Sequence, residues 1–421
     1  MEQQLKRNRQ LALLGVAHSS NHSLFVIAPP LLGLIMSGLN VSKSEIGLVT
    51  TIASFIYGAG SLIGGPLGDR IGEAKTITIC LALSGLSSFI MIAAGATQMV
   101  FVYTLALTLM AIWAGLYHPT ANALISKSFK GKVSESMGLH GVGGTLGVVL
   151  TPTIAWFIGA TYGWSWAFVV FGALCMILAF IFPRVFGREE KKDKESVSIA
   201  NVLRNRDLWV LLVFNVAVGL FMKGVELFFP TFLKENRGID PMWASVAYTL
   251  LLASGVPAQW IGGKSAGRFG SKKVLIAAST GICLSLISLL FFPIHMVGIS
   301  LFIVLYGLAF YAHQPALNSL TGFLTPQNQR GLVYGVFFFT SFGIGSVSQV
   351  ITGYVGDSYG LDAAFYILTG FALCALMLSF MLPDKREERL DREITSFVYK
   401  SINKGDCSSP ESRFLRGPRS S

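Results

Sequence analysis

Twelve long apolar stretches divide the chain, and they constrain its fold more than any other feature. A helix needs about 20 predominantly apolar residues to cross the hydrocarbon core of a bilayer, and each stretch is about that long or longer. They cover residues 11–36, 45–68, 74–96, 99–127, 133–159 and 164–183, and then 207–233, 242–267, 272–294, 296–324, 330–357 and 362–383. We therefore expect an all-α membrane protein with twelve transmembrane helices in the lipid bilayer.

The composition excludes most classes of soluble protein. The 421 residues are 52% hydrophobic and 13% charged, with a mean hydropathy of +0.60, whereas about a quarter of the residues are charged in typical soluble proteins. A soluble enzyme, a disordered regulator and a secreted disulfide scaffold are therefore excluded. The five cysteines have no spacing typical of a metal cluster or a disulfide framework.

Motifs of enzymes are also missing from the sequence. It contains no G-x-x-x-x-G-K-[ST] loop for a nucleotide phosphate and no H-E-x-x-H metal motif. We therefore expect no enzymatic activity, no cofactor and no metal. A membrane enzyme is one alternative class, and the histidines could in principle bind a metal for it. A receptor or structural protein is the other, but it would not need a Lys-Glu pair and histidines that face a cavity.

The positions of the basic residues predict the orientation in the membrane. Lys and Arg accumulate in the cytoplasmic loops of membrane proteins. With the N-terminus placed inside, 29 of the 33 Lys and Arg residues fall on the cytoplasmic side, and the outer loops hold only Lys43, Lys234 and Arg237. We expect a multi-pass protein of the cytoplasmic membrane with both termini in the cytoplasm. The net charge of +11 then reflects the orientation of the protein in the membrane and does not indicate binding to nucleic acid.

Three sequence blocks recur in the two halves of the chain. "GGPLGDRIGEAK" (64–75) matches "GGKSAGRFGSKK" (262–273), "YGWSWAF" (162–168) matches "YGLDAAF" (359–365), and Pro119 and Asn122 match Pro315 and Asn318. The shifts agree to within two residues, which indicates an internal duplication. We expect two six-helix bundles related by a pseudo-two-fold axis.

The charged segments set the expected domain boundaries. The only long charged stretch between spans is residues 184–206. We expect an N-terminal bundle over 1–183, a cytoplasmic linker over 184–206 and a C-terminal bundle over 207–383. The tail over 384–421 is low in apolar residues, so we expect it to be disordered.

The loop between the second and third spans resembles the signature of the major facilitator superfamily. That signature has glycines around an Asp-Arg pair and a following basic residue, which here are Gly65, Gly68, Asp69, Arg70, Gly72 and Lys75. The glycines permit a tight turn and close helix approach, and we expect Asp69 to pair with the basic N-terminal end of a neighbouring helix. The resemblance implies transport by alternating access, with spans one, four, seven and ten lining a central cavity.

Two further segments resemble the fosmidomycin-resistance type of exporter within that superfamily. They are "GLYHPTANALIS" (115–126) and the glycine-rich "GLHGVGGTLGVVLTP" (138–152). Carboxylate transporters could share the same pattern. We expect the glycines of the second segment to give a close, smooth contact between the halves, which would permit rocking around a central site.

Ionisable residues within the spans are candidates for the transport site, because they are costly at membrane depth. For substrate binding we select His22, Tyr117, His118, Lys223, His313 and Gln314, and for proton coupling His18, His22 and Glu226. His18 and His22 are four residues apart and share a helix face. His118 and His140 are expected at about the level of His18, with His140 serving in helix packing or hydrogen bonding.

Some of these residues also have a purely structural interpretation. Lys223 and Glu226 are three residues apart and could form an ion pair that only neutralises itself. His118 precedes Pro119, so its imidazole could bond a carbonyl that the proline leaves free. Asn122 and Asn318 recur in both halves, so we expect them to fix helix contacts or a helix break and not to bind substrate.

These residues together predict a secondary transporter. Lys223 and several protonatable histidines would attract an anion, so we expect a monomeric, proton-coupled antiporter that exports a small organic anion or drug, such as a phosphonate or carboxylate. A proton-coupled symporter that takes up an organic anion is one alternative. A multidrug exporter for lipophilic cations is the other.

Overall fold

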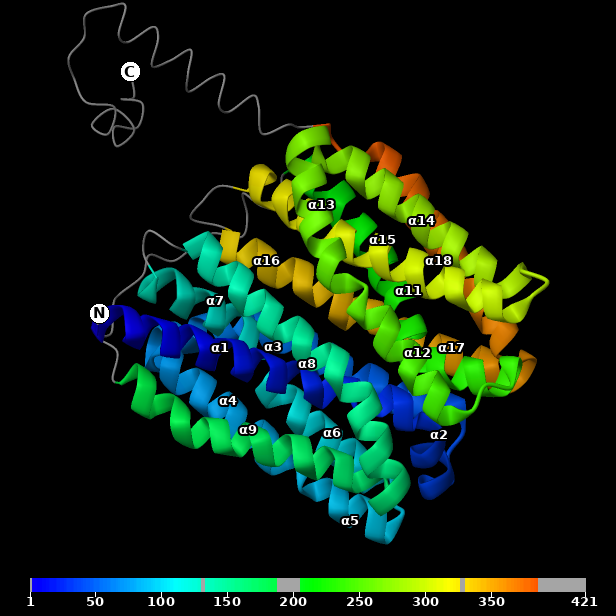
Figure 1. The fold of residues 1–421 in the computed structure, drawn as a ribbon, viewed down its shortest axis with the longest axis horizontal. Coiled ribbons are helices and arrows are strands. Elements are labelled where there is room, and N and C mark those ends of the chain that lie inside the picture. The colour runs from blue at the N-terminus through cyan, green and yellow to red at the C-terminus, as the bar shows by residue number, and fades with distance from the viewer. Residues whose placement is uncertain (1, 130–132, 188–204, 326–329, 385–421) are drawn as a thin grey trace, which may run out of the picture.

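The computed structural model describes residues 2–129, 133–187, 205–325 and 330–384. Most of the predicted linker (184–206) and nearly all of the predicted tail (384–421) lie outside these residues. The described chain is built from helices (Figure 1), which are α1 (Glu2–Val26), α2 (Ala28–Leu39), α3 (Lys43–Ile71), α4 (Glu73–Ser88), α5 (Ile90–Thr97), α6 (Val100–Ala114), α7 (Tyr117–Ser128), α8 (Val133–Tyr162), α9 (Trp164–Phe186), α11 (Arg206–Arg237), α12 (Pro241–Ala253), α13 (Gly255–Phe269), α14 (Ser271–Phe291), α15 (His295–Leu324), α16 (Arg330–Phe338), α17 (Val347–Tyr359) and α18 (Leu361–Met381).

Several of the expected spans consist of two consecutive helices. In the described chain, eleven helical segments are long and apolar enough to cross a membrane, counting α1 with α2, α4 with α5, α6 with α7, and α16 with α17 as single segments. The eighth expected span, 242–267, is formed by α12 and α13, which have 13 and 15 residues. The first span is interrupted at Ile27, where prolines occupy the first turn of α2, because proline cannot continue the hydrogen bonding of the helix before it.

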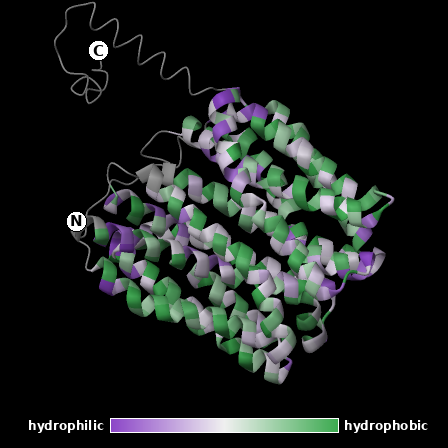
Figure 2. Ribbon diagram, in the orientation of Figure 1, coloured by the Kyte–Doolittle hydropathy of each residue, from purple (hydrophilic) through white to green (hydrophobic). Residues whose placement is uncertain are grey.

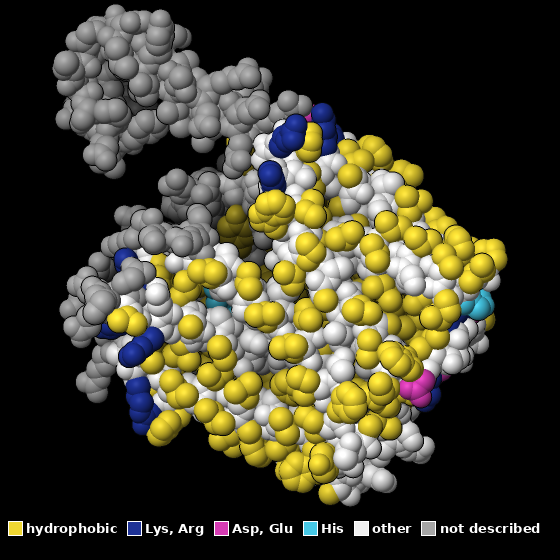
Figure 3. Space-filling model, in the orientation of Figure 1, with side chains coloured by type: hydrophobic (Ala, Val, Ile, Leu, Met, Phe, Trp, Pro, Cys, Tyr) yellow, Lys and Arg dark blue, Asp and Glu magenta, His cyan; other side chains and the backbone are white. Residues whose placement is uncertain are grey.

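The surface has the distribution expected of a protein surrounded by lipid. Large apolar side chains such as Phe101, Phe180 and Trp260 are exposed. Hydrophobic side chains are spread over the whole face seen in Figure 3, whereas the hydrophilic residues of Figure 2 gather toward the ends of the helices. This pattern is the inverse of a soluble protein, in which extended apolar surface is rare.

The twelve spans form two six-helix bundles, in agreement with the predicted fold class. Helices α1 to α9 make the first half and α11 to α18 the second (Figure 1). The duplicated loop has the same backbone in both, since Gly72 and Gly270 each end a helix with a φ of +98° and +92°, a conformation that favours glycine. Gly64 packs closely on Leu116, and its counterpart Gly262 packs in the same way on Ala312.

The halves meet tightly at one end of the molecule, which we call the closed end (residues 42–51 and 346–357). Thr51 and Ser346 exchange hydrogen bonds there, each hydroxyl donating to the other's carbonyl at 2.8 and 3.2 Å. An ion pair joins Lys43 of α3 to Glu235 of α11 with an Nζ–Oε2 distance of 3.0 Å. Polar contacts between the halves therefore seal this end.

The eleventh span contains a local change of helix type. Between α16 and α17, residues Phe339–Gly343 form a π-helical turn and Ile344–Ser346 a 3₁₀ turn. A π turn holds one more residue than an α turn and is frequent at functional sites. Phe337 and Phe338 at the end of α16 line the cavity, and α17 packs on α3 and α18.

The glycines of α8 do not have the contact expected from the sequence. A Cβ on Gly143 would clash with the backbone of Gly15, and one on Gly147 would clash with Ser19. Both partners lie on α1, so these glycines bring together two helices of the same half. The contact of α8 with the other half lies near its far end, where the hydroxyls of Thr153 and Thr249 are 2.8 Å apart. The prediction of a glycine contact between the halves was wrong.

Candidate functional site

A large cavity lies between the two halves. Its volume is about 2100 Å³, and it is lined by residues of both halves, including Asp69, Ser126 and Leu332 at the end opposite the closed end. We call that end the open end; Figure 3 shows the molecule hollowed there, between α7 and α13. The lining comes from the expected spans one, four, seven and ten and also from spans two, five, eight and eleven. The expected cavity helices are therefore only part of its wall.

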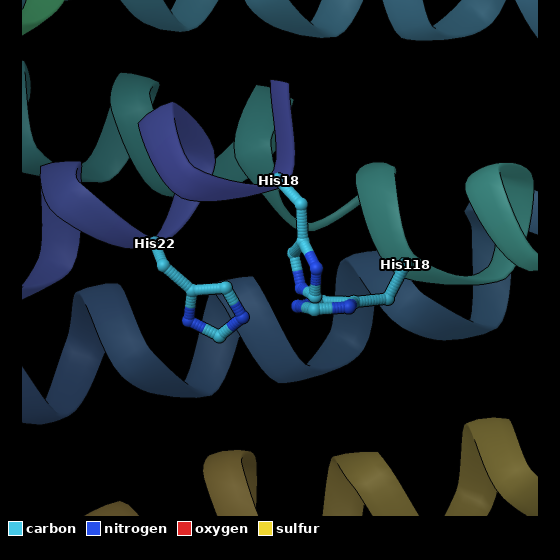
Figure 4. A group of neighbouring side chains, drawn as sticks. All are labelled: His18, His22 and His118. Carbon is cyan, nitrogen blue, oxygen red and sulfur yellow. The ribbon is translucent and has the colours of Figure 1, made fainter. Parts of the chain in front are cut away.

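Three histidines of the first half converge on one point of the cavity wall (Figure 4). His18 and His22 of α1 have ring centroids 4.6 Å apart, and His118 of α7 lies 5.1 Å from His18 and 5.0 Å from His22. All three line the cavity. His140 of α8 stacks on His18 with a centroid distance of 4.1 Å, and its carbonyl oxygen lies 2.8 Å from His18 Nδ1. The expected common level of these residues is confirmed.

Lys223 and Glu226 face this cluster from the second half. The Lys223 Nζ donates a hydrogen bond of 2.6 Å to Glu226 Oε2 and lies 4.1 Å above the ring of Phe342. The side chain of Lys223 is 8% exposed and that of Glu226 is 30% exposed. The predicted ion pair is therefore present, and its carboxylate is the more accessible partner.

His313 and Gln314 lie on α15 in the same cavity wall. The Nδ1 of His313 is hydrogen bonded to the carbonyl of Phe310, one turn earlier in its own helix, and the residue is buried. Gln314 is half-buried. Both residues therefore reach the cavity, as their place on the tenth span implied, but His313 is held away from the three histidines of the first half.

Tyr117 does not lie where the sequence placed it. It is fully buried and is not part of the cavity wall, and its hydroxyl donates to the carbonyl of Leu14 at 3.0 Å. Its ring instead packs behind His18 and His140. The break between α6 and α7 turns Tyr117 toward α1, so it supports the cluster and does not face a substrate. His140 is also absent from the cavity wall, which agrees with its expected packing role.

The glycine and Asp-Arg loop lies at the open end. Asp69 pairs with Lys127 at 3.9 Å, and Lys127 also bonds Glu73. Lys127 is in the last turn of α7, so the basic partner is at the C-terminal end of the neighbouring helix, whereas we expected the N-terminal end. A cation is favourable there, because the carbonyl end of a helix carries partial negative charge.

The other members of this motif shape the turn or face solvent. Gly68 packs on Thr120, and Gly65 touches Pro119. Arg70 and Lys75 are exposed, and Arg70 borders the cavity.

Some residues of the cavity wall were missed or misread from the sequence. Asn122 and Asn318 are both exposed and line the cavity, whereas we expected them to fix helix contacts. Tyr57 and Phe338 add aromatic wall beside His118, at 6.4 and 5.0 Å. The recurrence of the two asparagines at matching positions in both halves was the available signal for a shared place on the cavity.

Two bundles of membrane-spanning helices, enclosing a cavity that is closed at one end and carries an ion pair and several histidines in its wall, define a multi-pass membrane transporter. A family model described as "Major Facilitator Superfamily" matches residues 11–350, and the chain belongs to this family. The resemblance of the signature loop is thereby confirmed.

Known relatives and solved structures agree with this family. The chain is 23% identical over 389 residues to the fosmidomycin resistance protein of Escherichia coli K12, covering 90% of this chain and 93% of that one. It is 24% identical to a probable sulfoacetate transporter of Cupriavidus necator, covering 85% and 88%. A bacterial homologue of the human lysosomal transporter Spinster, solved in an inward-facing, unoccupied conformation, has a TM-score of 0.74 at 15% identity, covering 90% and 97%.

Proposed function

We propose that this protein is a proton-coupled transporter of small organic anions. The observation that carries the proposal is the Lys223–Glu226 pair in the cavity wall, with Nζ and Oε2 2.6 Å apart. Lys223 is the cation of the pair, and no other Lys or Arg of the described chain lies in the middle of a span. Around it the wall offers aromatic surface and a few polar groups, which is the usual build of a small-molecule site.

The pair links anion binding to proton binding. An anion that approaches Lys223 competes with the Glu226 carboxylate for the same ammonium group. A proton on Glu226 removes that competitor and leaves Lys223 with an uncompensated charge, which is costly away from water. Proton binding and anion binding therefore favour each other, and by linkage the effect is reciprocal.

This linkage favours symport, in which the proton and the anion move in the same direction. Export by exchange with protons is the second candidate. It is supported by the similarity to the fosmidomycin resistance protein of Escherichia coli K12 and by the resemblance of the "GLYHPTANALIS" segment to that type of exporter. In both cases the substrate class is an organic anion, for which the sulfoacetate transporter is a further precedent.

The orientation of the molecule follows from its basic residues. The open end of the cavity carries Arg70 and Lys127, and the N-terminal segment with Lys6 and Arg9 begins on that side. Since Lys and Arg accumulate in the cytoplasm, we place the open end and the N-terminus in the cytoplasm. The structure then corresponds to an inward-open state in a cytoplasmic membrane.

The test is a proton-flux assay in proteoliposomes that contain a pH dye. Phosphonates, sulfonates and carboxylates are added outside, and the luminal pH is recorded. Symport predicts that the lumen becomes more acidic as the anion enters, whereas exchange predicts that it becomes more alkaline. Protein-free liposomes are the control for direct permeation of weak acids.

Two variants assign the roles of the pair. Glu226→Gln is expected to abolish proton movement while anion counterflow continues, and Lys223→Gln is expected to abolish both. A response to lipophilic cations alone would contradict the anion proposal and would favour a multidrug exporter. An anion response that persists unchanged in Lys223→Gln would show that the site lies elsewhere.

A further inference from the structure

We propose that His18, His22 and His118 form a binding site for a divalent transition-metal ion such as Zn²⁺ or Ni²⁺. One ring nitrogen of each residue lies within 4.8 Å of one from each of the others, and all three side chains line the cavity. The sequence has no metal motif, because the fold brings His118 to the other two from a different span. The proposal is independent of the proposed function, since metal binding can be measured whether or not an anion is transported.

The hydrogen bond of His18 fixes which of its nitrogens can bind a metal. Its Nδ1 lies 2.8 Å from the carbonyl oxygen of His140. A carbonyl oxygen can only accept, so Nδ1 carries the proton and Nε2 carries the free electron pair. Histidines that ligate metals usually donate their other ring N–H to a carbonyl or carboxylate in this way. His18 is therefore held in the tautomer that a metal requires.

Two of the three imidazoles have a buried nitrogen without a hydrogen bond. The Nε2 atoms of His18 and His118 are buried and have no partner among the described residues. Buried polar atoms in proteins nearly always have one, and a buried ring nitrogen without a protein partner is suited to bind an ion or water. Figure 4 shows the rings of His18 and His118 close together and that of His22 directed to the same space.

The chemistry of the cluster suits a transition metal. Imidazole nitrogen binds Zn²⁺, Cu²⁺ and Ni²⁺ well, with Zn–N distances of about 2.0–2.1 Å. That geometry needs ligand nitrogens roughly 3.3 Å apart in a tetrahedron. The distances between the ring nitrogens must therefore shorten by about 1.5 Å at most. Such a change is within reach of side-chain rotation, because His22 borders open cavity space.

The cavity would supply the remaining ligand. Metal sites with three protein ligands keep a fourth position for water or another exchangeable group. A doubly charged ion at membrane depth is costly, so an anionic oxygen in that position would stabilise it. The site is therefore expected to bind metal more tightly when a carboxylate or phosphonate anion is present.

The test uses tag-free, metal-stripped protein in detergent. Co²⁺ is titrated while its visible absorption is followed, and Zn²⁺ is then titrated in competition. We expect one Co²⁺ per chain with the spectrum of a low-coordinate, nitrogen-rich site, displaced by Zn²⁺. In His22→Ala and His118→Ala the affinity is expected to fall by more than the roughly 10–100-fold that the loss of an outer-shell partner costs.

His295→Ala is the matched control, because this exposed histidine stands at the start of α15, away from the cavity, and we expect it to bind Co²⁺ as the wild type does. Thermal unfolding without metal shows whether each variant is folded, and His118→Gln replaces His118→Ala if the latter is not. Lack of stoichiometric Co²⁺ binding by the wild type overturns the proposal. Equal affinity in the wild type and the folded cavity variants also overturns it.

Discussion

Asp357 of α17 caps the first turn of α3 at Ser44. A carboxylate of the second half therefore satisfies backbone N–H groups at the start of a helix in the first half. Its Oδ2 accepts from the Ser44 backbone N–H at 2.7 Å and from the Ser44 hydroxyl at 2.5 Å, and its Oδ1 accepts from the Lys43 N–H at 3.1 Å. Backbone N–H groups at a helix start lack partners within the helix and carry partial positive charge. These contacts must break if the closed end is to open during transport.

We predict that Asp357→Asn shifts the conformational equilibrium toward opening of the closed end. The amide keeps the shape but loses the charge, and hydrogen bonds to a charged group contribute about 1.5–3 kcal/mol. A loss of about 1–2 kcal/mol corresponds to roughly a five- to thirtyfold change in the equilibrium. Distances between spin labels on α3 and α17 would report the change.

Asp362→Asn is the control for this prediction. Asp362 accepts hydrogen bonds from Arg237 and Asn236 at 3.1 and 2.8 Å, but both partners lie in the same half. The same chemical change there should leave the label distances unaltered. An equal shift in both variants would mean that the cap is not the cause.

Removing one or the other partner of the Lys223–Glu226 ion pair in α11 should lower the stability of the protein by different amounts. Glu226→Gln leaves Lys223, whose side chain is 8% exposed, whereas Lys223→Gln leaves the 30% exposed Glu226. Breaking a buried pair costs about 3–5 kcal/mol because the remaining charge is uncompensated, and water screens the more exposed charge. We expect the lower unfolding temperature for Glu226→Gln, and recovery in a Lys223→Met/Glu226→Leu double variant. The opposite order in thermal unfolding would contradict the structure.

The two copies of the glycine contact should be equally sensitive to added volume. A Cβ on Gly64 would lie 2.6 Å from the Leu116 carbonyl oxygen, and one on Gly262 would lie still closer to the carbonyl oxygen of Ala312. Overpacking of this kind costs about 1–3 kcal/mol. Gly64→Ala and Gly262→Ala are expected to lower the unfolding temperature in detergent. Gly267→Ala, where nothing lies within 4 Å, should leave it unchanged or raise it.

Tyr117→Phe separates a supporting residue from a substrate ligand. It removes the hydrogen bond to the Leu14 carbonyl, at a cost of about 0.5–1.5 kcal/mol in stability. Because Tyr117 is not in the cavity wall, substrate affinity should stay within about twofold. Asn122→Ala, which changes a side chain of that wall, should alter the affinity instead. Substrate affinity can be measured by counterflow or calorimetry. If Tyr117→Phe lowers it as much as Asn122→Ala does, Tyr117 has a direct role in binding.

The fold could be predicted from the sequence because the lipid bilayer restricts the structures that an apolar chain can adopt. Twelve apolar stretches, basic residues on one side and three repeated blocks determine the number of spans and the two bundles. Contacts between residues one turn apart were equally predictable, so the His18–His22 and Lys223–Glu226 pairs are confirmed as contacts. Their roles in transport stay predictions.

The sequence did not correctly predict which neighbouring helix a given side chain contacts. Each residue turns a helix by about 100°, so a small break such as that between α6 and α7 redirects Tyr117 from the cavity to α1. The same limit explains why Gly143 contacts its own half, and why Asp69 meets the far end of α7. Sequence periodicity shows which face is apolar, but it does not show which neighbour that face meets.

The π-helical turn at Phe339–Gly343 has a consequence for how one helix can serve two tasks. The wider π turn and the tighter 3₁₀ turn at Ile344–Ser346 that follows it change the winding of the span relative to an unbroken α-helix. Before these turns, Phe337 lies in the cavity wall; after them, Asp357 meets Ser44 of the other half. The change of helix type therefore lets a single membrane span meet two different surfaces. Its first part lines the cavity, and its last part contacts the first half at the closed end.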